Sequence, residues 1–201
     1  MLVALTGVPG VGKTSVTSEA MKRVDVDFNL INYGDFMFKC AKKRDLVNHR
    51  DEMRELNKEV QKEVQKDAAE EIHKLNNESP VILDTHCTIK TPTGYLPGMP
   101  KWVLERIDPD YIVIVEADPS EILVRRMKDR NRFRDIESEE LIESHQDINR
   151  AIAMSYSAIS GSLVKIIKNH DGALEDAVDE LKEILSEARL KMKDCENKDE
   201  W

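Results

Sequence analysis

The stretch Leu2-Val-Ala-Leu-Thr-Gly-Val-Pro-Gly-Val-Gly-Lys-Thr14 decides the fold of this chain. Its apolar first half, residues 2–6, predicts a short buried strand, and residues 13–23 have helical character. Residues 7–14 match the pattern GxxxxGK[ST] at every defined position, in which glycines let backbone N–H groups turn toward an oligophosphate. A glycine-rich turn with an incidental lysine is the alternative, but a strand before the loop and a helix after it favour a Walker A phosphate loop. The sequence therefore predicts a nucleoside triphosphate site.

Each polar residue of this loop has a chemical role. Lys13 offers a point charge to the β- and γ-phosphates, and the Thr14 hydroxyl suits Mg²⁺. The N-terminus of the helix that follows favours the same anion. Asp84 ends a predicted strand, where its carboxylate can hold a magnesium-bound water or simply cap the next turn through Thr85 or His86.

Apolar runs of strand length alternate with helical patterns along the whole chain. Strands separated by helices imply parallel pairing in an α/β fold. The Pro- and Gly-bearing segment 91–100 predicts a loop, and 50–78 predicts one amphipathic helix or two in series. Strands are expected at 2–6, 28–32, 81–84, 111–115 and 163–167, and further helices from Asp118, from a Ser138 cap to Ser160, and from about Gly172.

Composition excludes several classes of protein. The chain has 201 residues, 40% hydrophobic and 34% charged, which suits one or at most two domains with a full core. Its apolar runs are far shorter than the ~20 residues of a membrane helix, and its start does not resemble a signal peptide. Three isolated cysteines, at 40, 87 and 195, favour a reducing, cytoplasmic setting. The net charge of −9 argues against binding to nucleic acid or to an anionic membrane.

A basic segment interrupts this acidic chain. Residues 125–134 contain six basic side chains and one acidic one, a local charge of +5. Arginine neutralises and orients a phosphoryl group in transfer reactions, because its planar fork binds phosphate oxygens in pairs. An acidic run follows directly, so surface ion pairs are an equally good explanation.

Several motifs together resemble archaeal-type adenylate kinase, a P-loop nucleoside-monophosphate kinase, in register from Met1 to about Leu185. The Asp-Thr-His, Thr-Pro and Gly-Tyr-Leu-Pro-Gly combination is far more particular to this family than the phosphate loop. The motifs are residues 7–14, Ile31-Asn-Tyr-Gly-Asp-Phe-Met37, His49-Arg-Asp-Glu-Met-Arg54, Asp84-Thr-His-Cys-Thr-Ile-Lys-Thr-Pro92, Gly94-Tyr-Leu-Pro-Gly98, Arg132-Phe-Arg-Asp135 and Asn149-Arg150.

The resemblance implies one P-loop NTPase domain over residues 1–201, a three-layer α/β/α sandwich with a five-stranded parallel sheet. Its parts would be the core (1–32, 79–127 and 138–186), a helical NMP-binding segment (33–78), a very short lid (128–137) and a frayed tail (187–201).

The same resemblance implies reversible transfer of the γ-phosphate of Mg-ATP to AMP, giving two ADP. The ATP-binding residues would be Gly7, Val8, Pro9, Gly10, Val11, Gly12, Lys13, Thr14 and Ser15, with Thr14 and, through water, Asp84 on Mg²⁺. Catalytic roles would fall to Lys13, to Arg125, Arg132 and Arg134 on the lid side, and to Arg150 at the transferred phosphoryl. The AMP-binding residues would be Tyr33, Gly34, Arg54, Lys90, Tyr95 and Leu96.

Other expectations and alternatives complete the sequence interpretation. His86 and His145 are interpreted as structural, since a phosphate acceptor that is already anionic needs no strong base. Cys87 is expected to be a packed thiol. Family members of this type are typically trimers, and Trp102 with exposed methionines is a candidate interface. The alternatives are a kinase for CMP or UMP, and a P-loop ATPase or assembly switch.

Overall fold

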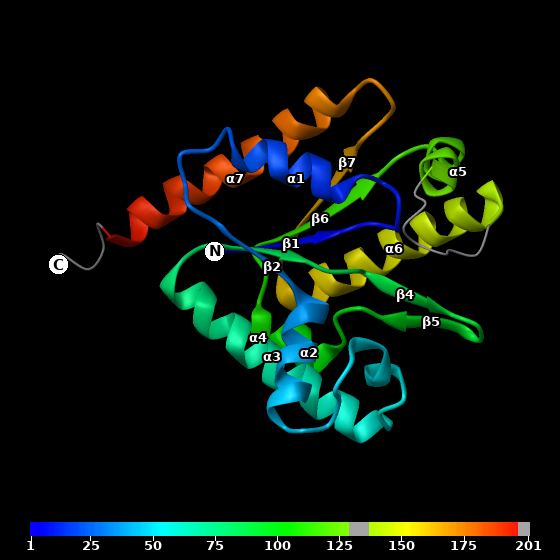
Figure 1. The fold of residues 1–201 in the computed structure, drawn as a ribbon. Helices are drawn as coiled ribbons and strands as arrows, with labels where there is room; N and C mark the ends of the chain where they lie inside the picture. The colour runs from blue at the N-terminus through cyan, green and yellow to red at the C-terminus, as the bar shows by residue number, and fades with distance from the viewer. Residues whose placement is uncertain (129–136, 197–201) are drawn as a thin grey trace.

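The computed structural model describes residues 1–128 and 137–196, with side chains described as far as residue 187. A five-stranded sheet forms its centre, with strand order β2-β3-β1-β6-β7 and every neighbouring pair parallel (Figure 1). All five strands expected from the sequence are confirmed. They are β1 (Leu2–Thr6), β2 (Asn29–Asn32), β3 (Val81–Asp84), β6 (Tyr111–Glu116) and β7 (Leu163–Lys168).

Helices cover both faces of the sheet, which confirms the three-layer α/β/α arrangement (Figure 1). On one face lie α1 (Lys13–Met21) and α7 (Leu174–Glu196). On the other lie α2 (Tyr33–Lys43), α3 (Lys58–Glu78), α4 (Lys101–Ile107) and α6 (Glu139–Ser160). The remaining helix, α5 (Pro119–Lys128), packs beside α6. None of the helices in the described ranges is long and apolar enough to cross a membrane.

The alternation of side chains along β1 explains the two apolar cores. Leu2 and Ala4 belong to the cluster beneath α3, α4 and α6, whereas Val3 and Leu5 belong to the cluster beneath α1 and α7. All four side chains are at most 1% exposed. A strand that is buried on both faces has to be continuously apolar, as residues 2–5 are.

Helix ends follow the capping chemistry of the sequence. The predicted cap of α6 is confirmed, because the Ser138 hydroxyl accepts from the Leu141 N–H, and Gly161 ends the helix at a φ of 74°. The segment 50–78 is two helices in series, a 3₁₀ helix η1 (Arg50–Arg54) and α3, with the Asn57 side chain capping the second.

One expectation was wrong. The segment 91–100 is not simply a loop, because it contains most of an antiparallel hairpin of β4 (Thr88–Thr91) and β5 (Gly94–Pro97). Its prolines and glycines resemble loop composition, but Pro92 lies in the hairpin turn and Pro97 ends β5. Of the tail expected at 187–201, the part up to Glu196 continues α7, and residues 197–201 lie outside the described residues.

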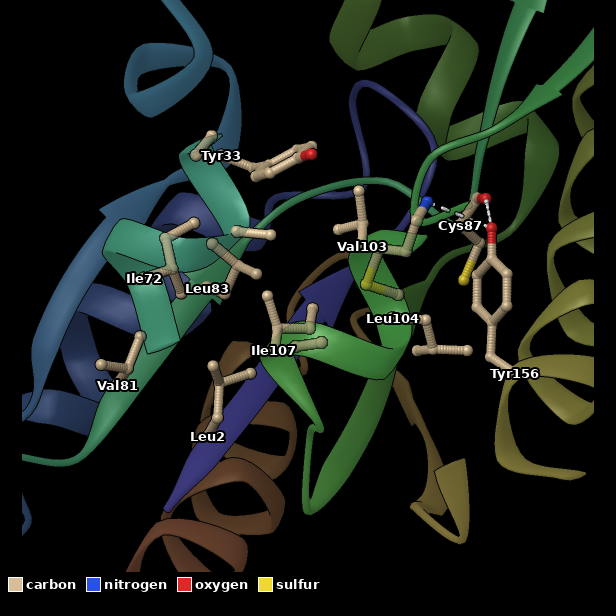
Figure 2. Close-up of a cluster of buried hydrophobic side chains, with 14 of the residues drawn as sticks. Leu2, Tyr33, Ile72, Val81, Leu83, Cys87, Val103, Leu104, Ile107 and Tyr156 are labelled. Carbon is tan, nitrogen blue, oxygen red and sulfur yellow. Dashed lines mark hydrogen bonds between the residues drawn. The ribbon is translucent and has the colours of Figure 1, made fainter. Parts of the chain in front are cut away.

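Helix α6 fastens this hairpin to the sheet. The Tyr156 hydroxyl donates to the Cys87 carbonyl at 2.8 Å and accepts from the Met99 N–H at 3.2 Å (Figure 2). Nearer the hairpin, the Thr88 hydroxyl donates to Asn149 Oδ1 at 2.6 Å and therefore accepts from His145 Nε2, 3.0 Å away. The side chains of this group are buried, so α6 holds the hairpin at a fixed position.

Candidate functional site

The phosphate loop lies between β1 and α1, as the sequence predicts. Gly7, Gly10 and Gly12 have φ values of 149°, 97° and 86°, a region that side chains rarely adopt. At Gly7 a Cβ would also lie 2.5 Å from the Val115 carbonyl oxygen. The glycines of the motif are therefore required by the backbone itself, and the loop leads directly into the N-terminus of α1 at Lys13.

Side chains from two distant segments fix the outside of this loop. Asn169, just after β7, donates to the Val11 carbonyl at 2.7 Å. Arg126 on α5 donates from Nε to the Pro9 carbonyl at 2.7 Å. Because these carbonyls are engaged from outside, the loop is held in shape before any ligand arrives. Asn169 was not singled out from the sequence, and Arg126 was only one member of the basic segment 125–134.

Lys13 and Asp84 form the centre of the site. Lys13 Nζ lies 2.7 Å from Asp84 Oδ1 and donates to the Thr85 carbonyl at 2.6 Å. Asn32, at the end of β2, donates from Nδ2 to Asp84 Oδ2 at 3.0 Å. The parallel strands β2 and β3 place these polar ends side by side, in register.

The donor set at this centre fits magnesium. Asp84 Oδ1 is buried, and its contact with Lys13 lacks hydrogen-bond geometry, so this oxygen is able to accept a hydrogen bond from a metal-bound water. Thr14, next to Lys13, is exposed. A carboxylate and a hydroxyl beside a phosphate loop are the hard oxygen ligands that Mg²⁺ prefers.

A second group of polar residues lies where β2 enters α2. Arg50 of η1 binds Asp35 and approaches Asn32 Oδ1 at 3.4 Å. Its guanidinium also covers Gly34, where a methyl group would collide with it. The sequence interpretation chose Arg54 from the same motif, but Arg54 is exposed and forms no ion pair within the described ranges. Arg50 is therefore the arginine of this motif that the fold brings to Gly34 and Asn32.

The predicted residue Tyr33 has a different environment from the one expected of a base-binding wall. Its side chain belongs to the core cluster, only 6% exposed, and its hydroxyl donates to the Gln65 carbonyl at 3.3 Å. Desolvation raises the pKa of its hydroxyl. Figure 2 shows the ring beside the other side chains of this cluster.

The β4–β5 hairpin brings Lys90 and Tyr95 together as a cross-strand pair, with Leu96 exposed next to them. The Tyr95 ring lies 5.0 Å from the His145 ring. Lys90 Nζ donates to the Glu137 carboxylate. Glu137 was not singled out from the sequence, where it reads as one member of an acidic run.

The predicted catalytic arginines occupy separate places. Arg125 pairs with Asp171 and donates to the Asn169 carbonyl at 2.9 Å, so it braces the phosphate loop from outside. Arg150 donates from Nε and Nη2 to the two oxygens of Glu116, each at 2.7 Å. Arg132 and Arg134 lie outside the described residues, as does most of the expected lid.

Glu116 is a buried carboxylate at the end of β6, 1% exposed, next to the loop. Desolvation acts to raise its pKa, but the hydrogen bonds from Arg150 and Lys168 outweigh it and the pKa is lowered. The carboxylate therefore remains charged and keeps Arg150 in one orientation.

The two histidines near the site do not have the properties of general bases. Desolvation lowers the pKa of the buried His145. Desolvation, and then the charge of Lys13, lower the pKa of His86 to about 4, although the residue is exposed. The structure agrees with a structural role for His145 and with the prediction that Cys87 is a packed thiol, 0% exposed.

Comparisons with known proteins identify relatives over most of the chain. The family model described as an AAA domain matches residues 6–143. Adenylate kinases of Pyrococcus abyssi and Thermococcus onnurineus are each 53% identical over 92% of this chain and 94% of their own. The adenylate kinase of Methanopyrus kandleri is 53% identical over 90% of this chain and 96% of its own.

Solved structures with low sequence identity share the fold. Shikimate kinase from Bacteroides thetaiotaomicron superposes with a TM-score of 0.54 at 17% identity, covering 92% of this chain and 98% of that one. The protein TT1252 from Thermus thermophilus gives a TM-score of 0.56 at 14% identity, covering 93% of this chain and 97% of that one.

Proposed function

Because this chain belongs to the adenylate kinase family, we infer that it transfers the γ-phosphate of ATP to AMP in a reversible reaction that gives two ADP. The observation that carries this function is the meeting of Lys13 of the phosphate loop with Asp84, whose other oxygen is bound by Asn32, the residue that Arg50 approaches from the opposite direction along the chain. A phosphotransferase needs such a second, cationic place for the acceptor, whereas an ATPase needs only one nucleotide pocket.

On the donor side, residues 7–15 hold the ATP phosphates. The backbone N–H groups of the loop and the N-terminus of α1 bind the anion, and Lys13 leaves Asp84 for the β- and γ-phosphates. Thr14 and Asp84, the latter through water, hold Mg²⁺, which neutralises charge on the phosphates when bound. The displacement of Lys13 leaves the Asp84 carboxylate available for that water.

On the acceptor side, Gly34, Arg54, Lys90, Tyr95 and Leu96 bind AMP, with Arg50 added from the structure. The closeness of Arg50 to Gly34 and Asn32 supports its addition. Tyr33 supports these acceptor-side residues from the core, since its ring is buried. The AMP phosphate is already anionic at neutral pH, so no side chain has to remove a proton from it.

The arginines stabilise the charge that spreads over the moving phosphoryl group. Arg150, held in orientation by Glu116, and Arg125, beside the loop, contribute from the described part of the chain. Arg132 and Arg134 are assigned to the lid side on the basis of the resemblance alone.

An acceptor screen tests the function. Purified protein with Mg-ATP is given AMP, CMP, UMP or GMP, and formation of the diphosphate is measured. We expect AMP to be the best acceptor, and poor turnover with AMP beside good turnover with CMP or UMP would replace it with the alternative kinase.

A two-nucleotide mimic separates a kinase from an ATPase switch. A compound that joins two adenosines through a phosphate bridge spans both sites and should bind much more tightly than ATP alone. Binding no tighter than ATP would favour the ATPase or assembly switch.

We also propose a homotrimer in the cytoplasm. Exposed apolar side chains on adjacent elements support an interface: Met154 and Ile159 on α6, and Leu163 and Ile166 on β7. Trp102 is not part of this surface, because it packs against the core and donates to Gln65 at 3.0 Å. Light scattering on the purified protein measures the oligomeric state directly.

A further inference from the structure

Glu137 forms hydrogen bonds with two cations that come from opposite sides of the site. It lies just before the Ser138 cap of α6. One carboxylate oxygen accepts from Lys90 Nζ, and the other accepts from Arg126 Nη1 at 2.6 Å. The carboxylate is 16% exposed and Arg126 only 8%, so that pair is largely desolvated, whereas Lys90 is 34% exposed.

The two cations are each anchored to a different nucleotide side. Arg126 donates to the Pro9 carbonyl, and its side chain packs 3.0 Å from the place of a Cβ on Gly10, so it belongs to the phosphate loop. Lys90 stands on β4, in the hairpin of the acceptor side. A single carboxylate therefore joins the donor side to the acceptor side.

The charge on Glu137 is stable in this position. Desolvation acts to raise its pKa, but the hydrogen bonds from Lys90 and Arg126 outweigh it and the pKa is lowered. A nucleotide phosphate is an anion of the same kind, and it competes with this carboxylate for the same donors. A phosphate that reaches either cation also repels the carboxylate, which sits within a few ångströms of it.

We propose that Glu137 couples the two nucleotide sites by holding Arg126 and Lys90 while both sites are empty. The nucleotide that binds first displaces the carboxylate from both cations, and the second nucleotide then finds its cation free. Linkage requires the effect to be reciprocal, so each nucleotide strengthens binding of the other by the same factor. This coupling rests on the proposed function, because it needs an acceptor nucleotide.

The test compares Glu137→Gln with the wild type by calorimetry. The probes are AMP and a non-hydrolysable ATP analogue with Mg²⁺, each titrated alone and in the presence of the other. In the wild type we expect each nucleotide to lower the dissociation constant of the other about tenfold, within the usual range of coupling between two sites. In Glu137→Gln we expect tighter binding of each nucleotide alone and a coupling factor near one.

A matched control removes an acidic partner elsewhere. Glu63→Gln neutralises a carboxylate of α3 that pairs with Arg44 on the surface, and it should keep the wild-type coupling. Circular dichroism checks folding of each variant. If Glu137→Gln does not fold, Glu137→Asp replaces it, because the shorter side chain cannot reach both cations and should also reduce the coupling.

The possible results separate this proposal from the proposed function. Wild-type coupling in Glu137→Gln, or weaker binding of each nucleotide alone, would overturn the role of Glu137 while transfer to AMP stays intact. A wild-type protein that binds the ATP analogue but not AMP would refute the coupling and the proposed function together.

Discussion

The Lys13 ammonium lies 2.7 Å from the Asp84 carboxylate, although one residue begins α1 and the other ends β3. This ion pair holds the lysine of the phosphate loop next to the carboxylate that is predicted to bind the metal through water. Under the proposed function, nucleotide binding would exchange the Asp84 carboxylate for phosphate oxygens around Lys13, so the lysine would keep an anionic partner.

Replacing Lys13 tests this exchange. Lys13→Ala removes the charge from the β- and γ-phosphates, and we expect kcat to fall by about 100-fold or more. Steady-state kinetics of ADP formation measure it. Lys22→Ala, in an exposed pair with Glu19, is the control and should keep wild-type turnover. Near-normal turnover of Lys13→Ala would refute its role.

Arg50 provides a test of the acceptor side. Since a hydrogen bond to a charged group contributes about 1.5–3 kcal/mol, Arg50→Met should raise the KM for AMP about tenfold or more and leave the KM for ATP unchanged. Arg44→Met, an arginine paired with Glu63 and Asp67, controls for loss of a surface charge. An effect of Arg54→Met without one of Arg50→Met would restore the assignment made from the sequence.

The buried carboxylate of Glu116 predicts a loss of stability. Glu116→Gln removes the buried anion shared by Arg150 and Lys168, and since both cations are partly exposed and Arg150 keeps Asp147, we expect a loss of about 1–2 kcal/mol. Urea unfolding measures the free energy of unfolding. Glu180→Gln, which breaks the exposed pair with Lys165, should cost far less. Equal losses of stability in the two variants would contradict the larger stabilising role of the buried Glu116 carboxylate.

His145 predicts a dependence of stability on pH. Its folded pKa lies below the ordinary histidine value of about 6.5, so the unfolded chain binds more protons as pH falls. The neutral His145 side chain therefore contributes its full share of the free energy of unfolding above the unfolded pKa. That share is lost as pH falls through about 6.5 toward the lower folded pKa. Urea midpoints between pH 7.5 and 5 should therefore decline, and less steeply in His145→Gln. An equally steep decline in that variant would show that His145 does not cause the pH dependence of stability.

The fold could be predicted from the sequence because its signals are local. The five strands are continuous apolar runs, and the phosphate loop needs its glycines for backbone reasons that a pattern records. The hairpin was missed because Pro92, Gly94 and Pro97 have the composition of a loop. Pairing between strands is a tertiary property that composition does not reveal.

The candidate site was predictable only where a residue belongs to a motif. Lys13 and Asp84 lie at the ends of recognisable elements and meet in the structure. Arg126 and Glu137 are single members of a basic and an acidic run, and Asn169 belongs to no motif, so their individual roles follow only from partners far along the chain.

The Tyr156 hydroxyl, which holds both the Cys87 carbonyl and the Met99 N–H, also sets an order for synthesis of the molecule. As the chain leaves the ribosome, Cys87 and Met99 emerge well before the helix that fixes them. A nascent chain that ends before α6 carries every residue of the phosphate loop and of the hairpin, yet it lacks the contacts that set one against the other. Asn169, which holds the Val11 carbonyl of the phosphate loop, emerges later still, so neither half is complete until the chain has been made past both Tyr156 and Asn169.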